Sequence, residues 1–294
     1  MKNWTRREFI VNSGRALVLL GISKGAFNTT RYNLRLETPQ VVITGLPAPF
    51  KGLKIAQLTD LHSSFIVSEG LLRSAARFVM KEKPDIICLT GDFVTGETKF
   101  LSGSVGKFNE KHLEKCVTAL EGLSAPMGIY GVLGNHDFWS GKEAVETITE
   151  GFSKRLGVVW LRNRSLRLTK GGTAIHLLGV DDYWEDTSSL DDALKGVDEF
   201  GVRILLSHNP DINELIELEK LRIDLVISGH THGGQITLPF IGAPFMPSKF
   251  GQKYLAGLVR DGNRQTYISR GVGHLMAPIR LNCPPEATTV ITLV

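Results

Sequence analysis

Cysteine is scarce in this sequence and forms no pattern. The 294 residues contain three cysteines, Cys88, Cys116 and Cys283, which are too few and too widely spaced for a disulfide framework or a zinc ribbon. We therefore expect free thiols. A large excess of charge of one sign is also missing, because the formal net charge is +4. This balance permits a phosphate-bearing or anionic-membrane partner, whereas nucleic-acid readers are usually more basic, so nucleic acid is not an expected partner.

Long apolar runs are absent as well, which matters most near the N-terminus. A helix that crosses a bilayer needs about 20 consecutive apolar residues, but the run at residues 16–22 is bounded by Arg15 and Lys24. Residues 5–10, with Arg6 and Arg7, resemble a twin-arginine export signature placed before this short run. We predict that residues 1–30 are a signal or membrane-anchoring segment and that residues 31–294 form one domain.

The expected location follows from that segment. No small-x-small cleavage site is obvious after the apolar run, so the segment is expected to stay attached. The protein would then be exported to the cell envelope and could contact a membrane surface through residues 1–30. Two alternatives stay open: attachment to the cytoplasmic face of the inner membrane, and an ordinary basic amphipathic helix packed on the domain.

The rest of the chain alternates between two hydrophobic periods. Short apolar or β-branched runs predict strands at residues 34–37, 41–43, 54–59, 85–90, 129–133, 174–180, 203–206, 224–228, 265–269 and 289–294. A period of 3.6 residues predicts helices at residues 68–82, 114–123, 141–156, 191–200 and 211–221. Loops are expected at residues 96–111 and 236–250. The alternation of strands with helices places the chain in the α/β class.

Polar residues follow five of these strands directly. The five segments are Asp60-Leu61-His62, Gly91-Asp92, Gly134-Asn135-His136-Asp137, Ser207-His208 and Gly229-His230-Thr231-His232. Because α/β sheets build their sites at the carboxyl ends of strands, we expect the segments to converge. One such aspartate is usually a turn residue and one such histidine a satisfied polar group. Five segments of this composition, each at a strand end, favour a common site.

The residue types in these segments indicate a catalytic metal site. Asp, His and Asn without cysteine are ligands of divalent ions that activate water, in contrast to structural zinc. Asp60 and His62 lie two positions apart, so an extended backbone would point both side chains at one ion. The glycines beside Asp92, Asn135 and His230 would let the chain turn without a side chain crowding the ions.

With these five blocks in order, the chain resembles the calcineurin-like metallophosphoesterases, whose signature is D-x-H, G-D, G-N-H-D/E, H and G-H-x-H. The resemblance runs from about residue 51 to the end of the chain. The flanking segments 207–211, 233–236, 269–273, 278–280 and 283–286 look like the bacterial envelope-associated phosphodiesterase branch. No ligand position of the signature is substituted.

The resemblance implies a fold and a set of roles. The implied fold is a four-layer α-β-β-α sandwich, two mixed sheets flanked by helices, with two divalent ions per chain at the edge of the sheets. By carry-over, one ion would be held by Asp60, His62, Asp92 and His232, and the other by Asp92, Asn135, His208 and His230. His136 would contact the substrate, and Asp137 would orient His136. Manganese is the expected metal, with zinc, iron and nickel as alternatives.

The function implied is two-metal hydrolysis of phosphate esters. We expect a phosphodiesterase that uses a hydroxide shared by the two ions as its nucleophile. One alternative is a pyrophosphatase of the UDP-2,3-diacylglucosamine type that acts on a lipid-linked substrate at the membrane. A metal-dependent nuclease, the lower-ranked alternative, would need a basic, aromatic-lined groove, and the sequence shows no concentrated stripe of that kind. A non-enzymatic binding protein would tolerate loss of Asn135 or His136, and both residues are present. The expected partner is a small-molecule or lipid-linked phosphate ester, and no protein partner is inferred.

Overall fold

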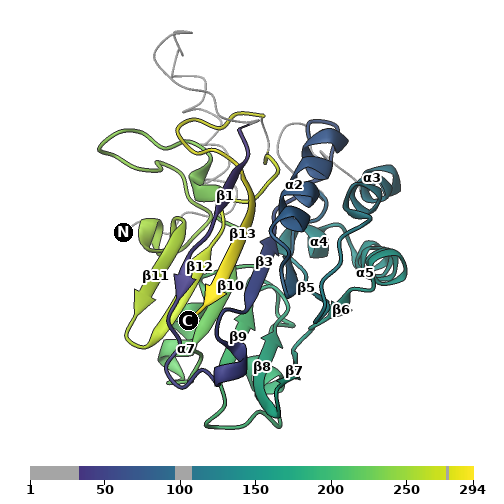
Figure 1. Ribbon diagram of the computed structural model, residues 1–294. Helices are drawn as coiled ribbons and strands as arrows, with labels where there is room; N and C mark the ends of the chain where they lie inside the picture. The colour runs from purple at the N-terminus through teal and green to yellow at the C-terminus, as the bar shows by residue number, and fades with distance from the viewer. Residues whose placement is uncertain (1–32, 97–107, 276–277) are drawn as a thin grey trace.

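Two mixed β-sheets pack face to face in a computed structural model that describes residues 33–96, 108–275 and 278–294 (Figure 1). The seven-stranded sheet has the order β1 (Arg35–Glu37), β13 (Glu286–Leu293), β3 (Lys54–Leu58), β4 (Ile86–Thr90), β5 (Ile129–Val132) and β6 (Val159–Trp160), and β2 (Gln40–Val41) pairs with β13. The six-stranded sheet has the order β11 (Gly257–Asp261), β12 (Arg264–Ile268), β10 (Leu225–Ser228), β9 (Arg203–Leu206), β8 (Thr173–Gly179) and β7 (Arg164–Lys170). Strands β3 to β6 are parallel, as are β8, β9, β10 and β12.

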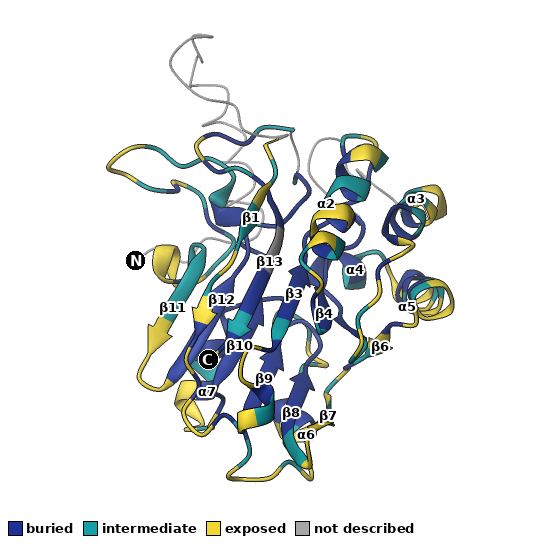
Figure 2. Ribbon diagram, in the orientation of Figure 1, coloured by how far each residue is buried: buried dark blue, intermediate teal, exposed yellow. Residues whose placement is uncertain are grey.

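Helices cover the outer face of each sheet. The seven-stranded sheet is covered by α2 (Glu69–Lys81), α3 (Glu110–Leu120) and α5 (Lys142–Leu156), and the other sheet by α6 (Leu190–Leu194) and α7 (Ile212–Leu218). In Figure 2, the central strands β4, β9 and β10 are buried, whereas α2, α3 and α5 are buried on one side and exposed on the other. The expected four-layer α-β-β-α sandwich is therefore confirmed.

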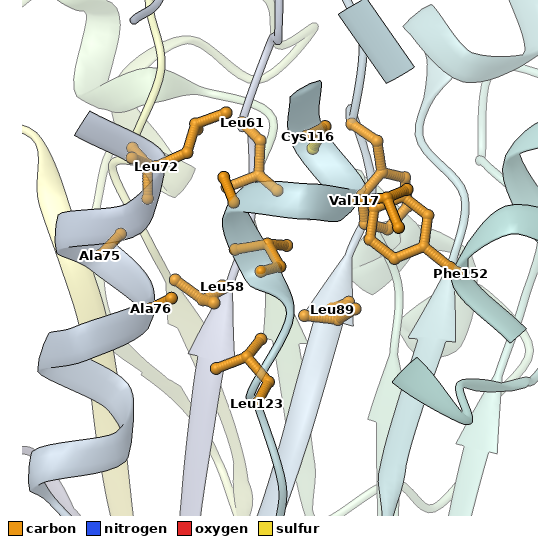
Figure 3. Packing of buried hydrophobic residues seen from close by; sticks show 14 of the residues in the cluster. Leu58, Leu61, Leu72, Ala75, Ala76, Leu89, Cys116, Val117, Leu123 and Phe152 are labelled. Carbon is orange, nitrogen blue, oxygen red and sulfur yellow. The ribbon is translucent and has the colours of Figure 1, made fainter. Parts of the chain in front are cut away.

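Neighbouring residues of one strand belong to different layers. In β4, Ile87 and Leu89 join the cluster under the helices, while Ile86 and Cys88 lie between the sheets. Such strands are apolar on both faces because both faces are covered. Figure 3 shows the helix-side cluster, in which Leu61 packs with side chains of α2 and α3. Since burial of one leucine contributes about 1.5–3 kcal/mol, Leu61 anchors the segment between the candidate ligands Asp60 and His62.

Local signals predicted the central elements better than the edges. Helix α2 begins as expected after Ser68, whose side chain accepts a hydrogen bond from the Leu71 N–H at 3.3 Å. The helix expected at residues 191–200 is wrong, because α6 ends at Leu194 and Gly196 has a φ of 72°. Helix α3 starts inside the loop expected at residues 96–111. The strands β6, β7 and β11 were not predicted.

The N-terminal prediction, residues 1–30, lies outside the described residues. Within residues 33–96, 108–275 and 278–294, no helix combines the length and hydropathy of a bilayer span.

Candidate metal centre

The five polar segments meet where the carboxyl ends of both sheets come together. Asp60, Asp92 and Asn135 follow β3, β4 and β5 of the seven-stranded sheet, and His208 and His230 follow β9 and β10 of the other sheet. All five side chains are buried. Ligand atoms within 4.8 Å of one another form three groups: Asp60 with His62 and His232, Asp92 with His208 and His230, and His62 with Asp92 and His136.

The first group is centred on Asp60, His62 and His232. The Nε2 atom of His232 lies 3.2 Å from Asp60 Oδ1 and 3.0 Å from His62 Nε2. The Oδ2 atom of Asp92 lies 3.4 Å from His62 Nε2. These four side chains are those that the resemblance implied for one ion.

The second group shares Asp92 with the first. The same Oδ2 atom of Asp92 lies 3.2 Å from His208 Nε2, which in turn lies 3.2 Å from His230 Nδ1. Asn135 Oδ1 is buried and has no hydrogen-bond partner among the described residues. A buried amide oxygen without a donor is costly, and a metal ion would satisfy it. The position of Asp92 between the groups suits a ligand that bridges two ions.

Hydrogen bonds to backbone carbonyls determine which nitrogen of two histidines faces the site. His208 Nδ1 lies 2.7 Å from the Thr90 carbonyl oxygen, and His230 Nε2 lies 2.8 Å from the Pro247 carbonyl oxygen. Because the nitrogen that faces a carbonyl must donate, the lone pairs of His208 Nε2 and His230 Nδ1 are directed at the site. The donor set of imidazole nitrogens, carboxylates and one amide oxygen fits divalent ions.

The ligand segments have an unusual backbone. Asp60 and His62 have φ values of 52° and 43°, so the extended backbone expected for this pair is wrong. Asp92, His230 and His232 have φ values of 57°, 71° and 53°. Each such residue costs about 1–3 kcal/mol, and this conformation persists only when the surrounding structure imposes it. Burial of Leu61 in the helix-side core provides that constraint for the first segment.

Two glycines next to the ligands are required by close approach of carboxylates. A Cβ at Gly134 would overlap Asp92 Oδ1 and lie 2.8 Å from Asp92 Cγ. A Cβ at Gly229 would overlap Asp60 Oδ2 and lie 2.9 Å from Thr59 Cγ2. The glycines therefore make room for the ligands themselves, which refines the expectation that they make room for the ions.

Asp137 does not have the contacts that we expected of it. Its carboxylate accepts hydrogen bonds from the backbone N–H groups of Asp92 at 2.8 Å, Phe93 at 2.9 Å and Gly134 at 2.9 Å. The ring of His136 is instead oriented by a hydrogen bond between its Nδ1 and the Thr95 carbonyl oxygen. Both residues lie in the short helix α4 (Asn135–Trp139). Asp137 thus holds the backbone that carries Asp92.

At four of the ligands, Asp60, Asp92, His62 and His230, the surroundings favour the protonation states that bind metal. Burial disfavours ionisation of Asp60 and Asp92, but the neighbouring histidines outweigh it and lower the pKa of both carboxyls. Burial lowers the pKa of His62, and burial together with His208 lowers that of His230 to about 3. Ionised carboxylates and neutral imidazoles are the forms that coordinate metal ions.

Comparisons with known proteins show which family this chain belongs to. The sequence profile of the calcineurin-like phosphoesterases matches residues 53–234. The chain is 30% identical to the metallophosphoesterase YkuE of Bacillus subtilis over 301 residues, which cover 100% of this chain and 99% of YkuE. It belongs to the calcineurin-like phosphoesterase family.

Two further proteins are similar over most of this chain. Phosphodiesterase YaeI of Escherichia coli is 34% identical over 241 residues, which cover 82% of this chain and 81% of YaeI. Among solved structures, a dimetal phosphatase from Danio rerio has a TM-score of 0.46 and 13% identity, and the match covers 76% of this chain and 88% of that structure. As a calcineurin-like phosphoesterase, the chain is a metal-dependent enzyme of a binuclear family, and the clustered ligands suit that chemistry.

The sequence patterns did not single out several residues that lie beside the metal centre of this calcineurin-like phosphoesterase. Strand β8 is also followed by two carboxylates, Asp181 and Asp182, and Asp182 is fully buried. Burial raises the pKa of Asp182 to about 7. The rule that polar residues follow the strands of the site would have found this segment. Trp139 and Trp184, which pack on His136 and His230, had no such signal.

Proposed function

We propose that this protein hydrolyses phosphodiesters with two divalent ions, manganese first among them. The observation that carries the proposal is the position of Asp92, whose Oδ2 lies within 3.4 Å of His62 and 3.2 Å of His208, one from each ligand group. The similarity to YaeI, which is named a phosphodiesterase, supports the choice of ester.

The residues of the site have two proposed roles, metal binding and contact with the substrate. Asp60, His62, Asp92 and His232 would hold one ion, and Asp92, Asn135, His208 and His230 the other. Bound divalent ions would supply Lewis acidity to the phosphoryl oxygens and lower the pKa of the attacking water. His136, held through Nδ1 by the Thr95 carbonyl oxygen, keeps Nε2 for the substrate. A histidine in that position can stabilise a phosphoryl oxygen or transfer a proton to the leaving group.

The hydrogen bonds of a buried arginine beside the ligands support diesters over monoesters as substrates. A monoester phosphate carries about −1.5 to −2 charges at pH 7, and such dianions are commonly bound by an arginine fork. Within the described part of the chain, Arg280 is the arginine that contacts a ligand, since its Nη2 lies 3.4 Å from His232 Nδ1, and it is fully buried. Its Nη2 donates to the carbonyl oxygens of Arg270 at 2.7 Å and Gly273 at 2.8 Å. Arg280 therefore braces the backbone and offers no free fork to a doubly charged monoester, which supports the choice of a diester.

A screen of the purified, manganese-loaded full chain tests this proposal. We expect hydrolysis of bis(4-nitrophenyl) phosphate to exceed that of 4-nitrophenyl phosphate and of a nucleotide diphosphate sugar. Asp92→Asn, prepared in parallel, controls for contaminating hydrolases. A preference for the monoester, or equal rates in the Asp92→Asn variant, would contradict the proposal.

A lipid-linked substrate is the second candidate, favoured by the loop at residues 236–250. Phe240 is fully exposed at 109% relative accessibility and has a φ of 67°, which bulky residues rarely adopt. Ile241 is 62% exposed. Met246 of the same loop is buried. The same loop contacts the metal centre, since the Pro247 carbonyl oxygen lies 2.8 Å from His230 Nε2.

For this second candidate, an envelope location would bring Phe240 and Ile241 to a bilayer. Flotation with vesicles of zwitterionic or anionic lipid tests it, with Phe240→Ser as the variant and Phe65→Ser, at an exposed phenylalanine outside the loop, as the control. Equal flotation of the Phe240→Ser variant and the wild-type protein would rule out a role of this loop at the membrane.

A further inference from the structure

Two tryptophans lie beside the metal centre and belong to neither ligand group. Trp139 ends α4, and Trp184 lies in the loop after β8. Their rings stack, with centroids 6.1 Å apart and planes inclined by 16°. Both side chains are partly exposed, whereas the core aromatic Phe152 is fully buried. The tryptophan pair therefore has surface that a ligand can contact.

The pair is continuous with the histidines of the site. The ring of Trp139 lies 4.9 Å from that of His136, and the ring of Trp184 lies 4.4 Å from that of His230, nearly perpendicular to it. We call these four residues the aromatic wall. One end of the wall is the candidate substrate contact and the other end is a metal ligand. A phosphate ester bound at the metal centre would thus lie next to the wall.

Hydrogen bonds and an ion pair hold the wall in place. Trp139 Nε1 donates to Glu185 Oε1 at 3.1 Å, which joins α4 to the loop that carries Trp184. Arg162 forms two hydrogen bonds of 2.8 Å with Asp181 and lies 5.4 Å above the ring of Phe138. These contacts connect the same two segments a second time. A wall that is already ordered loses little conformational entropy when a ligand packs against it.

The indole N–H of Trp184 points to a ligand as well. Among the described residues, Nε1 of Trp184 is buried without a hydrogen-bond acceptor. Buried indole N–H groups usually have an acceptor, and a substrate oxygen would provide one. We infer, on the basis of the function proposed above, that the aromatic wall binds a planar aromatic or heteroaromatic group of the ester substrate. Trp184 is the specificity-determining residue of this site.

Two phosphonates of different size separate the wall from the metal centre. Calorimetry on the manganese-loaded full chain compares phenylphosphonate with methylphosphonate, which share the metal-binding group and differ in the ring. We expect phenylphosphonate to bind about tenfold more tightly, a difference of about 1.4 kcal/mol. Trp184→Leu and Trp139→Leu should reduce the ratio to between one and two by weakening phenylphosphonate alone. Trp184→Phe should keep most of it.

Trp160→Phe is the matched control, because the ring of Trp160 packs on Phe93 and Phe152 of the helix-side cluster and its Nε1 donates to the Thr149 carbonyl oxygen at 3.0 Å. Metal content is measured for every variant. Loss of an ion from Trp184→Leu, or equal weakening of both phosphonates, would show that the tryptophans only brace the ligands and would overturn the inference.

Hydrolysis of the model diester by the wild-type protein is scored separately. Hydrolysis together with equal affinity for the two phosphonates overturns the aromatic-wall inference alone. A preference for phenylphosphonate without any hydrolysis overturns the proposed function alone.

Discussion

Replacement of Gly134 by alanine is a steric test of the metal centre. The added Cβ would overlap Asp92 Oδ1 and lie 2.7 Å from the Asp92 backbone nitrogen, whereas non-bonded heavy atoms settle at about 3.5 Å or more. Gly134 has a φ of −103°, which alanine adopts freely, so backbone strain does not contribute. The Asp92 carboxylate must therefore move by about 1 Å.

The expected losses of stability, turnover and metal affinity in the Gly134→Ala variant follow from the contacts of Asp92. Overpacking of this kind costs about 1–3 kcal/mol of stability, and a misplacement of about 1 Å at a reacting centre can cost about 100-fold in rate. Because Asp92 Oδ2 faces both ligand groups, both ions should bind more weakly. Metal analysis, chemical denaturation and turnover of a model diester measure the three effects on one preparation.

Two further glycines make the test specific. Gly151→Ala in α5 is the control, since its nearest neighbour is Val117 Cγ2 at 3.8 Å, and it should stabilise the protein by about 0.5–1 kcal/mol. Gly229→Ala crowds Asp60 instead, so it should weaken the first ion more than the second. A Gly134→Ala protein that binds two ions and turns over normally would refute the bridging position of Asp92.

Four other predictions follow from the site and the N-terminus. Asp92→Asn should lower metal content from two ions and reduce activity by orders of magnitude; one ion per wild-type chain would contradict this. His136→Asn should keep both ions but slow turnover by about 10²- to 10⁴-fold, with a larger loss on esters with poor leaving groups if His136 donates a proton. Burial alone would lower the pKa of His208, but Asp92 raises it well above its usual range, so metal loading at pH 7 should release a proton. Calorimetry in buffers of different ionisation enthalpy measures this release, and heats that do not depend on the buffer would contradict the prediction. Exchange of Arg6 and Arg7 for lysine should leave the protein in the cytoplasm, and fractionation that finds the wild-type protein wholly cytoplasmic would end the export hypothesis.

The chemistry of the site was readable from the sequence because its signals are local. Strand β4 is apolar from Ile86 to Leu89, and the ligand Asp92 comes two residues after its end at Thr90. The same relation holds for Asp60 after β3 and His208 after β9. Parallel strands bring such positions to one edge without any knowledge of side-chain contacts. Helix α2 was equally accessible, since Ser68 caps it in sequence as well as in space.

Edge elements depended on tertiary context. The helix predicted to continue to residue 200 stops at Leu194, and Phe200 is 85% exposed. Strand β7 lies at the edge of its sheet and alternates with charged, exposed positions such as Arg164 and Lys170. Edge strands carry such charges to avoid pairing with other chains, so their hydrophobic pattern is weak.

The detailed geometry of the centre was decided by tertiary structure alone. The left-handed backbone at Asp60 and His62 exists because Leu61 is held in the core, and Asp137 acts on the Asp92 backbone because α4 packs against that turn. The stacking of Trp139 on Trp184 joins segments that no local period connects. The sequence alone determined which chemical groups reach the centre, since residue type and strand end are local properties. Their orientation and the aromatic wall arise from contacts between distant segments, which hydrophobic periodicity does not encode.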